Sequence, residues 1–122
     1  RVLHEPIEKY VNRYVSYYSK ISLECKNADL DCYFFLQPLP SYYYDRELYF
    51  SSSDGGFTNH QNQYGLFVKE IRNKHLENVI DLSEVLRETD KSYIDKVHYS
   101  YAANKVIAAN ISRVVFGHSD SR

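Results

Sequence analysis

The sequence lacks most of the patterns that would place it directly in a structural class. Its 122 residues include no methionine, no tryptophan, two cysteines, three prolines and four glycines. Two cysteines cannot form a disulfide framework, and no Cys-x-x-Cys pair is present for zinc or redox chemistry. No apolar run reaches the roughly 18 residues of a membrane-spanning helix, so no transmembrane segment is expected, and the first residues do not predict a signal peptide. A chain that starts at Arg1 and contains no methionine is expected to be processed or to be a fragment.

Neither sign of charge is in excess. The chain has 15 basic and 16 acidic residues and a formal net charge of −1. Domains that bind nucleic acid usually carry a basic excess or stripe, so no nucleic-acid partner is expected. A hydrophobic content of 43% argues against disorder. The length allows one domain at most.

Tyrosine is abundant, with 13 residues, and four of them lie with Phe50 and Phe57 in a segment that has no helical or strand periodicity. This segment runs from Ser41 to about Gln61, and loops of such length in compact domains usually carry function. We expect Tyr42, Tyr43 and Tyr44 to line a substrate pocket, because a tyrosine ring combines an apolar body with a polar tip. The alternative is that these rings only pack the loop against the rest of the protein.

Apolar residues at three- and four-residue spacing predict three helices. The first begins at Pro6 and ends at Lys26-Asn27, the second covers 64–75, and the last begins at an N-capping Ser100. The stripe of the first helix consists of Ile7, Tyr10, Val11, Tyr14, Val15, Tyr18, Ile21 and Cys25. The stripe of the last helix consists of Ala103, Val106, Ile107, Asn110, Ile111, Val114 and Val115.

Two short apolar runs, 32–36 and 79–82, predict buried strands. Ser83 is expected to cap a short helical turn after the second run. The order helix–strand–helix–strand–helix predicts α/β architecture with a parallel sheet and right-handed crossovers. Two strands cannot cover three apolar helix stripes. We therefore expect the fold to be incomplete and its N-terminal half to be missing.

The cysteines and most histidines show no ligand pattern. Cys25 and Cys32 flank the turn between the first helix and the first strand. A disulfide there suits a secreted enzyme, but two buried free thiols are the favoured interpretation. His4, His60, His75 and His118 have no metal-ligand spacing, and no Gly-rich phosphate loop is present. No metal and no cofactor are expected.

The segment 93–100, Tyr-Ile-Asp-Lys-Val-His-Tyr-Ser, carries the strongest chemical signal. Asp95 precedes His98 by three residues on a turn that opens into the last helix. A carboxylate so placed can accept a hydrogen bond from the ring Nδ1, which leaves Nε2 free to take a proton from a nucleophile. The alternative is a surface aspartate beside a histidine that only caps the helix.

The run 93–108 resembles the last conserved block of the SGNH/GDSL hydrolase superfamily, which has Asp-x-x-His followed by a helix-capping Ser or Thr. Phe34-Phe35-Leu36-Gln37-Pro38 is similar to the penultimate core strand of that family, and Val79-Ile80-Asp81-Leu82-Ser83 to its final strand. With the last helix, the resemblance covers nearly the whole chain. The one departure is Ala103, where many members have glycine.

The resemblance implies that residues 1–122 are the C-terminal portion of a single three-layer α/β/α, flavodoxin-like domain with a parallel sheet. His98 matches the general base of a Ser-His-Asp triad, and Asp95 the residue that orients it. The nucleophilic serine and the oxyanion-hole residues have no counterpart here and are expected in the missing N-terminal segment. The implied substrate is a small-molecule ester, either an acyl ester or an acetylated sugar.

Two other functions remain open from the sequence. An O-acyltransferase would use the same triad with a sugar hydroxyl as acceptor, and a non-catalytic module would keep the fold for binding or structure. For the catalytic interpretation we expect an Asp95 carboxylate oxygen about 2.6–3.2 Å from His98 Nδ1. His98 Nε2 should then face a cleft at the carboxyl ends of the strands.

Overall fold

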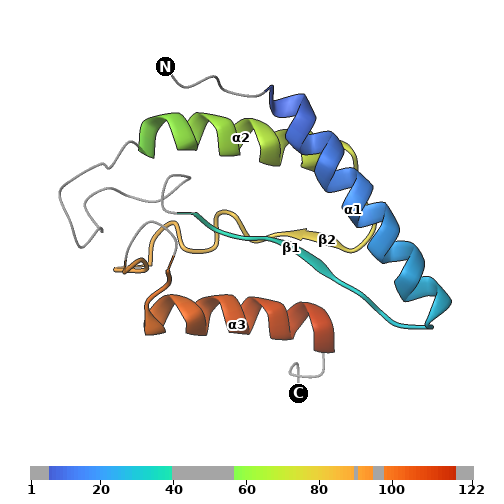
Figure 1. The fold of residues 1–122 in the computed structure, drawn as a ribbon. Coiled ribbons are helices and arrows are strands. Elements are labelled where there is room, and N and C mark those ends of the chain that lie inside the picture. Colours follow the sequence, from blue (N-terminus) through green and yellow to red (C-terminus); the bar gives the residue numbers. More distant parts are fainter. Residues whose placement is uncertain (1–5, 40–56, 90, 95–97, 118–122) are drawn as a thin grey trace.

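A computed structural model of the chain describes residues 6–39, 57–89, 91–94 and 98–117, with only the backbone described for 57–62. The elements follow in the order α1 (Ile7–Asn27), β1 (Phe34–Leu36), α2 (Phe57–Asn73), β2 (Val79–Asp81) and α3 (Tyr101–Phe116). Figure 1 shows three layers, with α1 and α2 on one face of the two strands and α3 on the other.

The two strands pair in parallel, which confirms the prediction from the order of elements. Phe34 lies opposite Val79, and Leu36 lies opposite Asp81. Both strands are shorter than predicted, because ladder pairing begins only at Phe34 and ends at Leu36. Within the described residues these two strands make up the whole sheet.

A small core joins α1, β1 and α2. It contains four buried side chains, Val11, Leu36, Val68 and Ile71, against which half-buried rings such as Phe67 pack. All four lie in predicted elements: Val11 in the first helix, Leu36 in the first strand, and the other two in the second helix. A second cluster of Leu86, Tyr93 and Ala103 holds the start of α3 against the segment that follows β2.

The second helix differs from its prediction. It begins at Phe57 rather than Tyr64 and ends at Asn73 rather than His75. The first turns of α2 fall in the polar stretch Thr58-Asn59-His60-Gln61, where no apolar stripe marks a helix, so periodicity could not locate the start. At the other end, His75 adopts a left-handed conformation with φ of 49°, which terminates the helix.

Cys25 and Cys32 form a disulfide, so the favoured interpretation of two free thiols is wrong. The turn after α1 brings their Cα atoms to 6.3 Å, within the usual range for a disulfide. Asp29 makes this possible by adopting a left-handed conformation (φ 58°), and Leu30 N–H then donates to the Cys25 carbonyl at 2.9 Å. The bond ties the C-terminal end of α1 to the entry of β1.

The predicted cap at Ser83 is also wrong. The Ser83 hydroxyl is buried without a hydrogen-bond partner among the described residues. Instead, the Asp81 carboxylate accepts from Ser83 N–H at 2.8 Å, and Arg72 of α2 bonds to both Asp81 and Glu84. The acceptor that starts this turn is therefore two residues upstream of the predicted one.

In the described part of the chain, no helix combines the length and apolar character needed to cross a membrane.

Replacing both cysteines by serine should lower the free energy of unfolding by about 2–3 kcal/mol, because the unfolded chain gains the freedom of an opened short loop. Urea unfolding of the oxidised protein and of the Cys25→Ser/Cys32→Ser variant measures the difference. Wild type treated with reductant should match the variant. Two titratable thiols in the unreduced, unfolded protein would contradict the disulfide.

Candidate functional site

The loop that carries His98 is closed by backbone hydrogen bonds. Tyr93 and Tyr99 form an antiparallel bridge, and Ile94 N–H donates to the His98 carbonyl at 2.9 Å. One pair further out, Ser100 N–H donates to the Ser92 carbonyl at 2.7 Å. The two ends of the loop are thus hydrogen-bonded to each other before and after the Tyr93–Tyr99 bridge.

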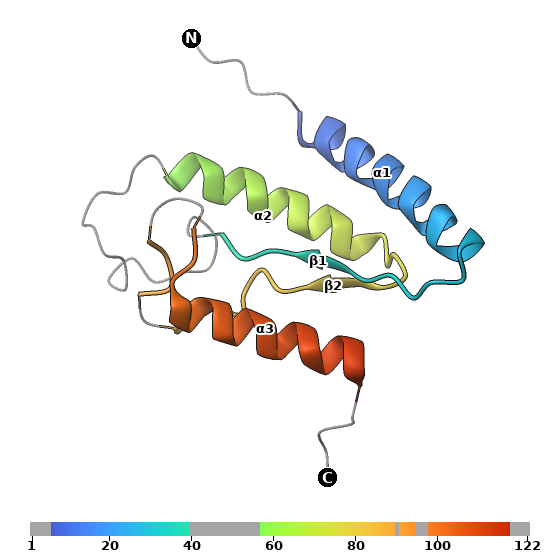
Figure 2. The same ribbon diagram turned by 60° about the horizontal axis from the view of Figure 1, so that its bottom comes forward.

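Tyr99 connects this loop to the carboxyl end of β1 through a side-chain hydrogen bond. Its hydroxyl donates to the Pro38 carbonyl at 2.7 Å, across 61 positions of sequence. The Tyr99 ring also lies 5.6 Å from that of Tyr93, centroid to centroid. Figure 2 shows the loop before α3 beside the end of β1. In open α/β sheets, ligands usually bind at the carboxyl ends of the strands.

Burial raises the pKa of the Tyr99 hydroxyl above its usual value. The hydroxyl therefore stays protonated at neutral pH and remains a donor to Pro38. Burial, reinforced by the nearby Tyr18, likewise raises the pKa of Tyr14 on α1.

The start of α3 is fixed by a side-chain cap and by close packing. Ser100 is the N-cap, as predicted, and its hydroxyl accepts from Ala103 N–H at 3.2 Å. Ala103 is fully buried against Leu86 and Tyr93. A small side chain at this position lets the first turn of α3 approach the segment that bears the loop.

His98 is exposed, one residue before the anchored Tyr99. Asp95 lies outside the described residues, and so do Tyr42, Tyr43 and Tyr44. The predicted distance between Asp95 and His98 Nδ1 and the predicted tyrosine pocket therefore stay predictions. Tyr99, the residue after His98, is bonded to Pro38 at the carboxyl end of β1, although 61 positions of sequence separate the two.

An apolar groove of about 320 Å³ opens between the N-terminal part of α1 and α2, next to the segment that leaves β1. The side chains that line it are Ile7, Tyr10, Leu39, Gln63, Tyr64 and Phe67. The Tyr64 hydroxyl donates to the Gln37 carbonyl at 2.6 Å, which fixes one wall. The sequence analysis missed this groove, because its walls come from three separate elements and no local pattern joins them.

No cluster of three or more potential metal ligands occurs among the residues that the structure describes. The Asp81 and Glu84 carboxylates lie close together, but both pair with the Arg72 guanidinium. It acts as a link between α2 and the end of β2.

Comparison with known proteins finds no matching family model, no similar curated protein and no similar solved structure.

Tyr99→Phe should lower the free energy of unfolding by about 1 kcal/mol, because the Pro38 carbonyl loses its donor. The folded state favours the protonated hydroxyl, so this stabilisation is present below pH about 10 and declines as pH rises above it. Urea unfolding of both proteins at pH 7 and at pH 10.5 should show a smaller difference at the higher pH.

Tyr101→Phe is the matched control for this experiment, because Tyr101 is 80% exposed and lies only two residues away. Its substitution should change stability by less than about 0.5 kcal/mol. Equal effects of the two substitutions would contradict an anchoring role for Tyr99.

Proposed function

We propose that this chain is the C-terminal part of an SGNH/GDSL-type serine ester hydrolase, with His98 as general base and Asp95 as the residue that orients it. The observation that carries the proposal is the position of His98. It is exposed on a loop that is closed at its base and bound through Tyr99 to the segment after β1. A base in this position can reach a substrate at the carboxyl ends of the strands.

The architecture around the loop supports the same proposal. Strands β1 and β2 are parallel, and α2 connects them along the chain. This βαβ unit is expected in the final part of a doubly wound α/β domain. The Asp-x-x-His sequence precedes Ser100, which is the N-cap of α3. The conserved block of the SGNH/GDSL superfamily, on which the proposal rests, likewise has a helix-capping Ser or Thr after Asp-x-x-His.

In the proposed reaction, His98 Nε2 removes the proton from a serine hydroxyl as the oxygen attacks the ester carbonyl. The Asp95 carboxylate accepts from Nδ1–H and stabilises the imidazolium. His98 then returns the proton to the leaving alcohol, and water completes hydrolysis of the acyl-enzyme. The serine and the oxyanion hole belong to the N-terminal segment that we expect to precede this chain.

The groove near the carboxyl end of β1 supports a small ester as the substrate class. Its walls are mostly apolar, with Gln63 as a polar side chain and Leu39 directly after the residue that Tyr99 contacts. Such a groove suits the acyl part of a small ester. An acyltransferase would use the same residues and differ only in the alcohol that accepts the acyl group.

His98→Ala in the full-length protein should reduce kcat for hydrolysis of p-nitrophenyl butyrate by at least about 100-fold, since the nucleophile loses its base. Asp95→Asn should reduce it less than His98→Ala. Steady-state kinetics with matched far-UV circular dichroism separates catalytic loss from unfolding.

His75→Asn is the control for these variants, because His75 is exposed at the end of α2, before β2. Asparagine tolerates the left-handed backbone of that residue, so activity should stay at the wild-type level. Wild-type hydrolysis by His98→Ala would refute the catalytic assignment of His98, whereas no hydrolysis by the wild-type full-length protein would favour the non-catalytic binding module. Faster product formation on adding a sugar alcohol, with ester recovered on the sugar, would identify an acyltransferase.

A further inference from the structure

The backbone that leaves β1 stops pairing with β2 just before a proline. Leu36 is the last residue of the ladder, and its carbonyl accepts from Leu82 N–H at 2.9 Å. Pro38 follows two residues later, has a fully buried side chain and has no N–H to donate. The carbonyls of Gln37 and Pro38 lie beyond the ladder, so their hydrogen bonds must come from other groups.

Two tyrosine hydroxyls supply these hydrogen bonds. The Tyr64 hydroxyl donates to the Gln37 carbonyl at 2.6 Å. The Tyr99 hydroxyl donates to the next carbonyl, that of Pro38, at 2.7 Å. Tyr64 belongs to α2 on one face of the strands, whereas Tyr99 directly precedes α3, which lies on the other face (Figure 1). Residues 37–39 thus form a strap at the carboxyl end of β1 that is held from both helical layers.

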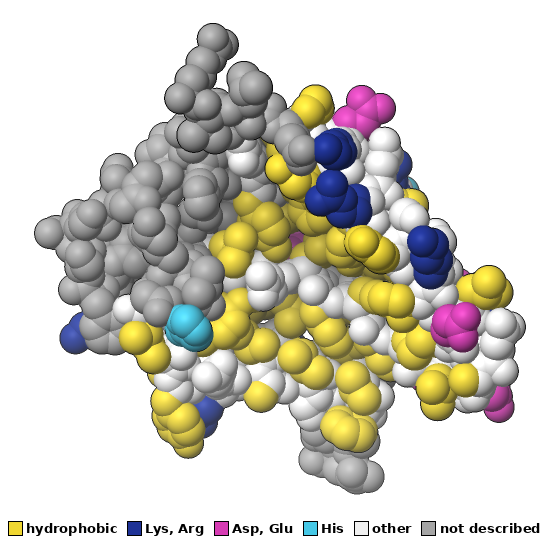
Figure 3. Space-filling view, viewed as in Figure 1, with side chains coloured by type: hydrophobic (Ala, Val, Ile, Leu, Met, Phe, Trp, Pro, Cys, Tyr) yellow, Lys and Arg dark blue, Asp and Glu magenta, His cyan; other side chains and the backbone are white. Residues whose placement is uncertain are grey.

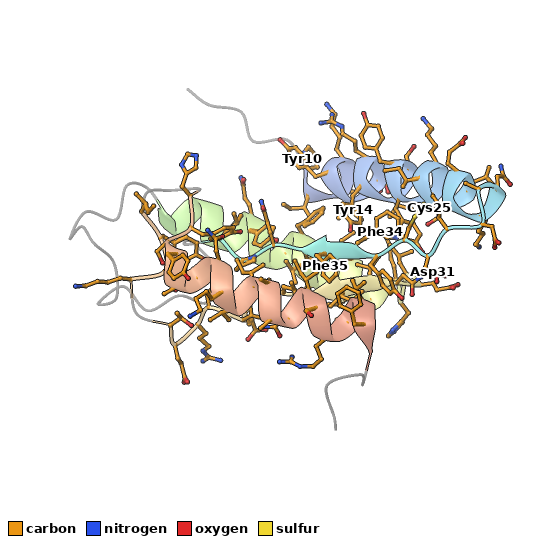
Figure 4. All side chains as sticks on the ribbon, turned by 90° about the horizontal axis from the view of Figure 1, so that it is seen from below. Tyr10, Tyr14, Cys25, Asp31, Phe34 and Phe35 are labelled. Carbon is orange, nitrogen blue, oxygen red and sulfur yellow. A yellow bond between two sulfur atoms is a disulfide. The ribbon has the colours of Figure 1, made fainter. Side chains whose placement is uncertain are left out.

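The strap also forms part of the apolar groove. Leu39 lines the groove, and so does the ring of Tyr64, which stacks on Phe67 with ring centroids 6.1 Å apart. Figure 3 shows that hydrophobic side chains continue below α1 on the face where β1 lies in front. From α1, Tyr14 meets Phe67 edge-on at 5.5 Å, and Figure 4 shows Tyr10 and Tyr14 on the N-terminal half of this helix. The position of the strap therefore affects the shape of the groove.

The same strap holds the loop that carries His98. Tyr99, which bonds to the strap, is covalently joined to His98, and its ring packs against the buried Tyr93. On the other side of the loop, Ile94 N–H donates to the His98 carbonyl at 2.9 Å. A shift of the strap would therefore pass through Tyr99 to the backbone of His98.

We propose that the strap couples the apolar groove to the loop that carries His98, with Tyr64 and Tyr99 as positioning residues. Tyr99 sets the position of His98, and Tyr64 sets the wall of the groove against which an acyl group packs. Because both hydroxyls act on adjacent peptide groups, a change at one is transmitted to the other. The coupling itself does not depend on ester hydrolysis, whereas its effect on turnover rests on the proposed function.

Amide hydrogen exchange of the full-length protein, followed by NMR, tests the coupling without any requirement for activity. Ile94 N–H reports on the loop because it is bonded to the His98 carbonyl. Rates are taken relative to Val15 N–H inside α1, which reports on global unfolding. Tyr99→Phe should accelerate Ile94 exchange at least about 10-fold, and Tyr64→Phe, although it lies in α2, at least about 3-fold.

Tyr18→Phe is the matched control for this experiment. The Tyr18 hydroxyl also donates to a backbone carbonyl at 2.7 Å, but its acceptor is Glu77, at the amino end of β2. Its loss should lower the Tm about as much as Tyr64→Phe and leave the relative exchange of Ile94 unchanged. An Ile94 rate that does not respond to Tyr64→Phe, or that responds equally to Tyr18→Phe, would overturn the coupling.

Steady-state kinetics with p-nitrophenyl butyrate measures the effect on turnover. Tyr99→Phe should lower kcat about 10-fold with little change in KM, because the base loses its alignment in the transition state. Tyr64→Phe should mainly raise KM, by about 3-fold, because the wall of the groove moves. The double variant should lose less kcat/KM than the product of the two single losses, since both hydroxyls act through one strap.

A Tyr99→Phe enzyme with wild-type kcat, or losses that multiply in the double variant, would overturn the positioning roles. A Tyr18→Phe enzyme should keep wild-type kcat and KM. Absence of hydrolysis by the wild-type full-length protein would instead refute the proposed function, and the Ile94 exchange rates would still decide the coupling.

Discussion

The parallel ladder between Phe34–Leu36 and Val79–Asp81 is the constraint on which the other parts of the structure depend. Parallel strands cannot be joined by a tight turn, so α2 must cross over one face of the sheet. Leu36 couples the ladder to the core, because its carbonyl bonds to Leu82 N–H while its side chain is buried with Val11, Val68 and Ile71. Backbone pairing and burial of apolar surface thus stabilise the same arrangement.

The same ladder determines where long-range contacts form. Both strands end at one edge of the sheet, so the segment after β1 and the segment after β2 lie near each other. The bond between the Tyr99 hydroxyl and the Pro38 carbonyl joins the segment before α3 to the segment after β1, and His98 is the residue before Tyr99. The groove beside Leu39 opens at this place as well. Strand direction therefore explains why these two segments, which are distant in sequence, meet at the carboxyl ends of the strands.

Predictions from the sequence succeeded where the determining interactions are local. The bounds of α1 depend on the periodicity of its apolar residues. The N-cap of α3 depends on the Ser100 hydroxyl, which accepts a hydrogen bond from an N–H only three residues away. The start of α2 was misplaced because its first turns carry no apolar stripe. The cap at Ser83 was misassigned because the acceptor is the Asp81 carboxylate. Both side chains stand near the start of the turn, and the sequence alone does not show which of the two accepts the hydrogen bond.

By itself the sequence determined the order of the elements, the parallel direction of the strands and the His98 motif at the start of the last helix. These follow from the helical period of 3.6 residues, from continuous apolar runs of strand length, from capping chemistry and from the rule that crossovers join parallel strands. Only the tertiary structure decided the Cys25–Cys32 disulfide, the anchoring of Tyr99 on Pro38 and the groove between α1 and α2. Each of these depends on the distance between groups from different segments, and that distance is set by the backbone path of the turns and by packing between elements, which no local pattern in the sequence encodes.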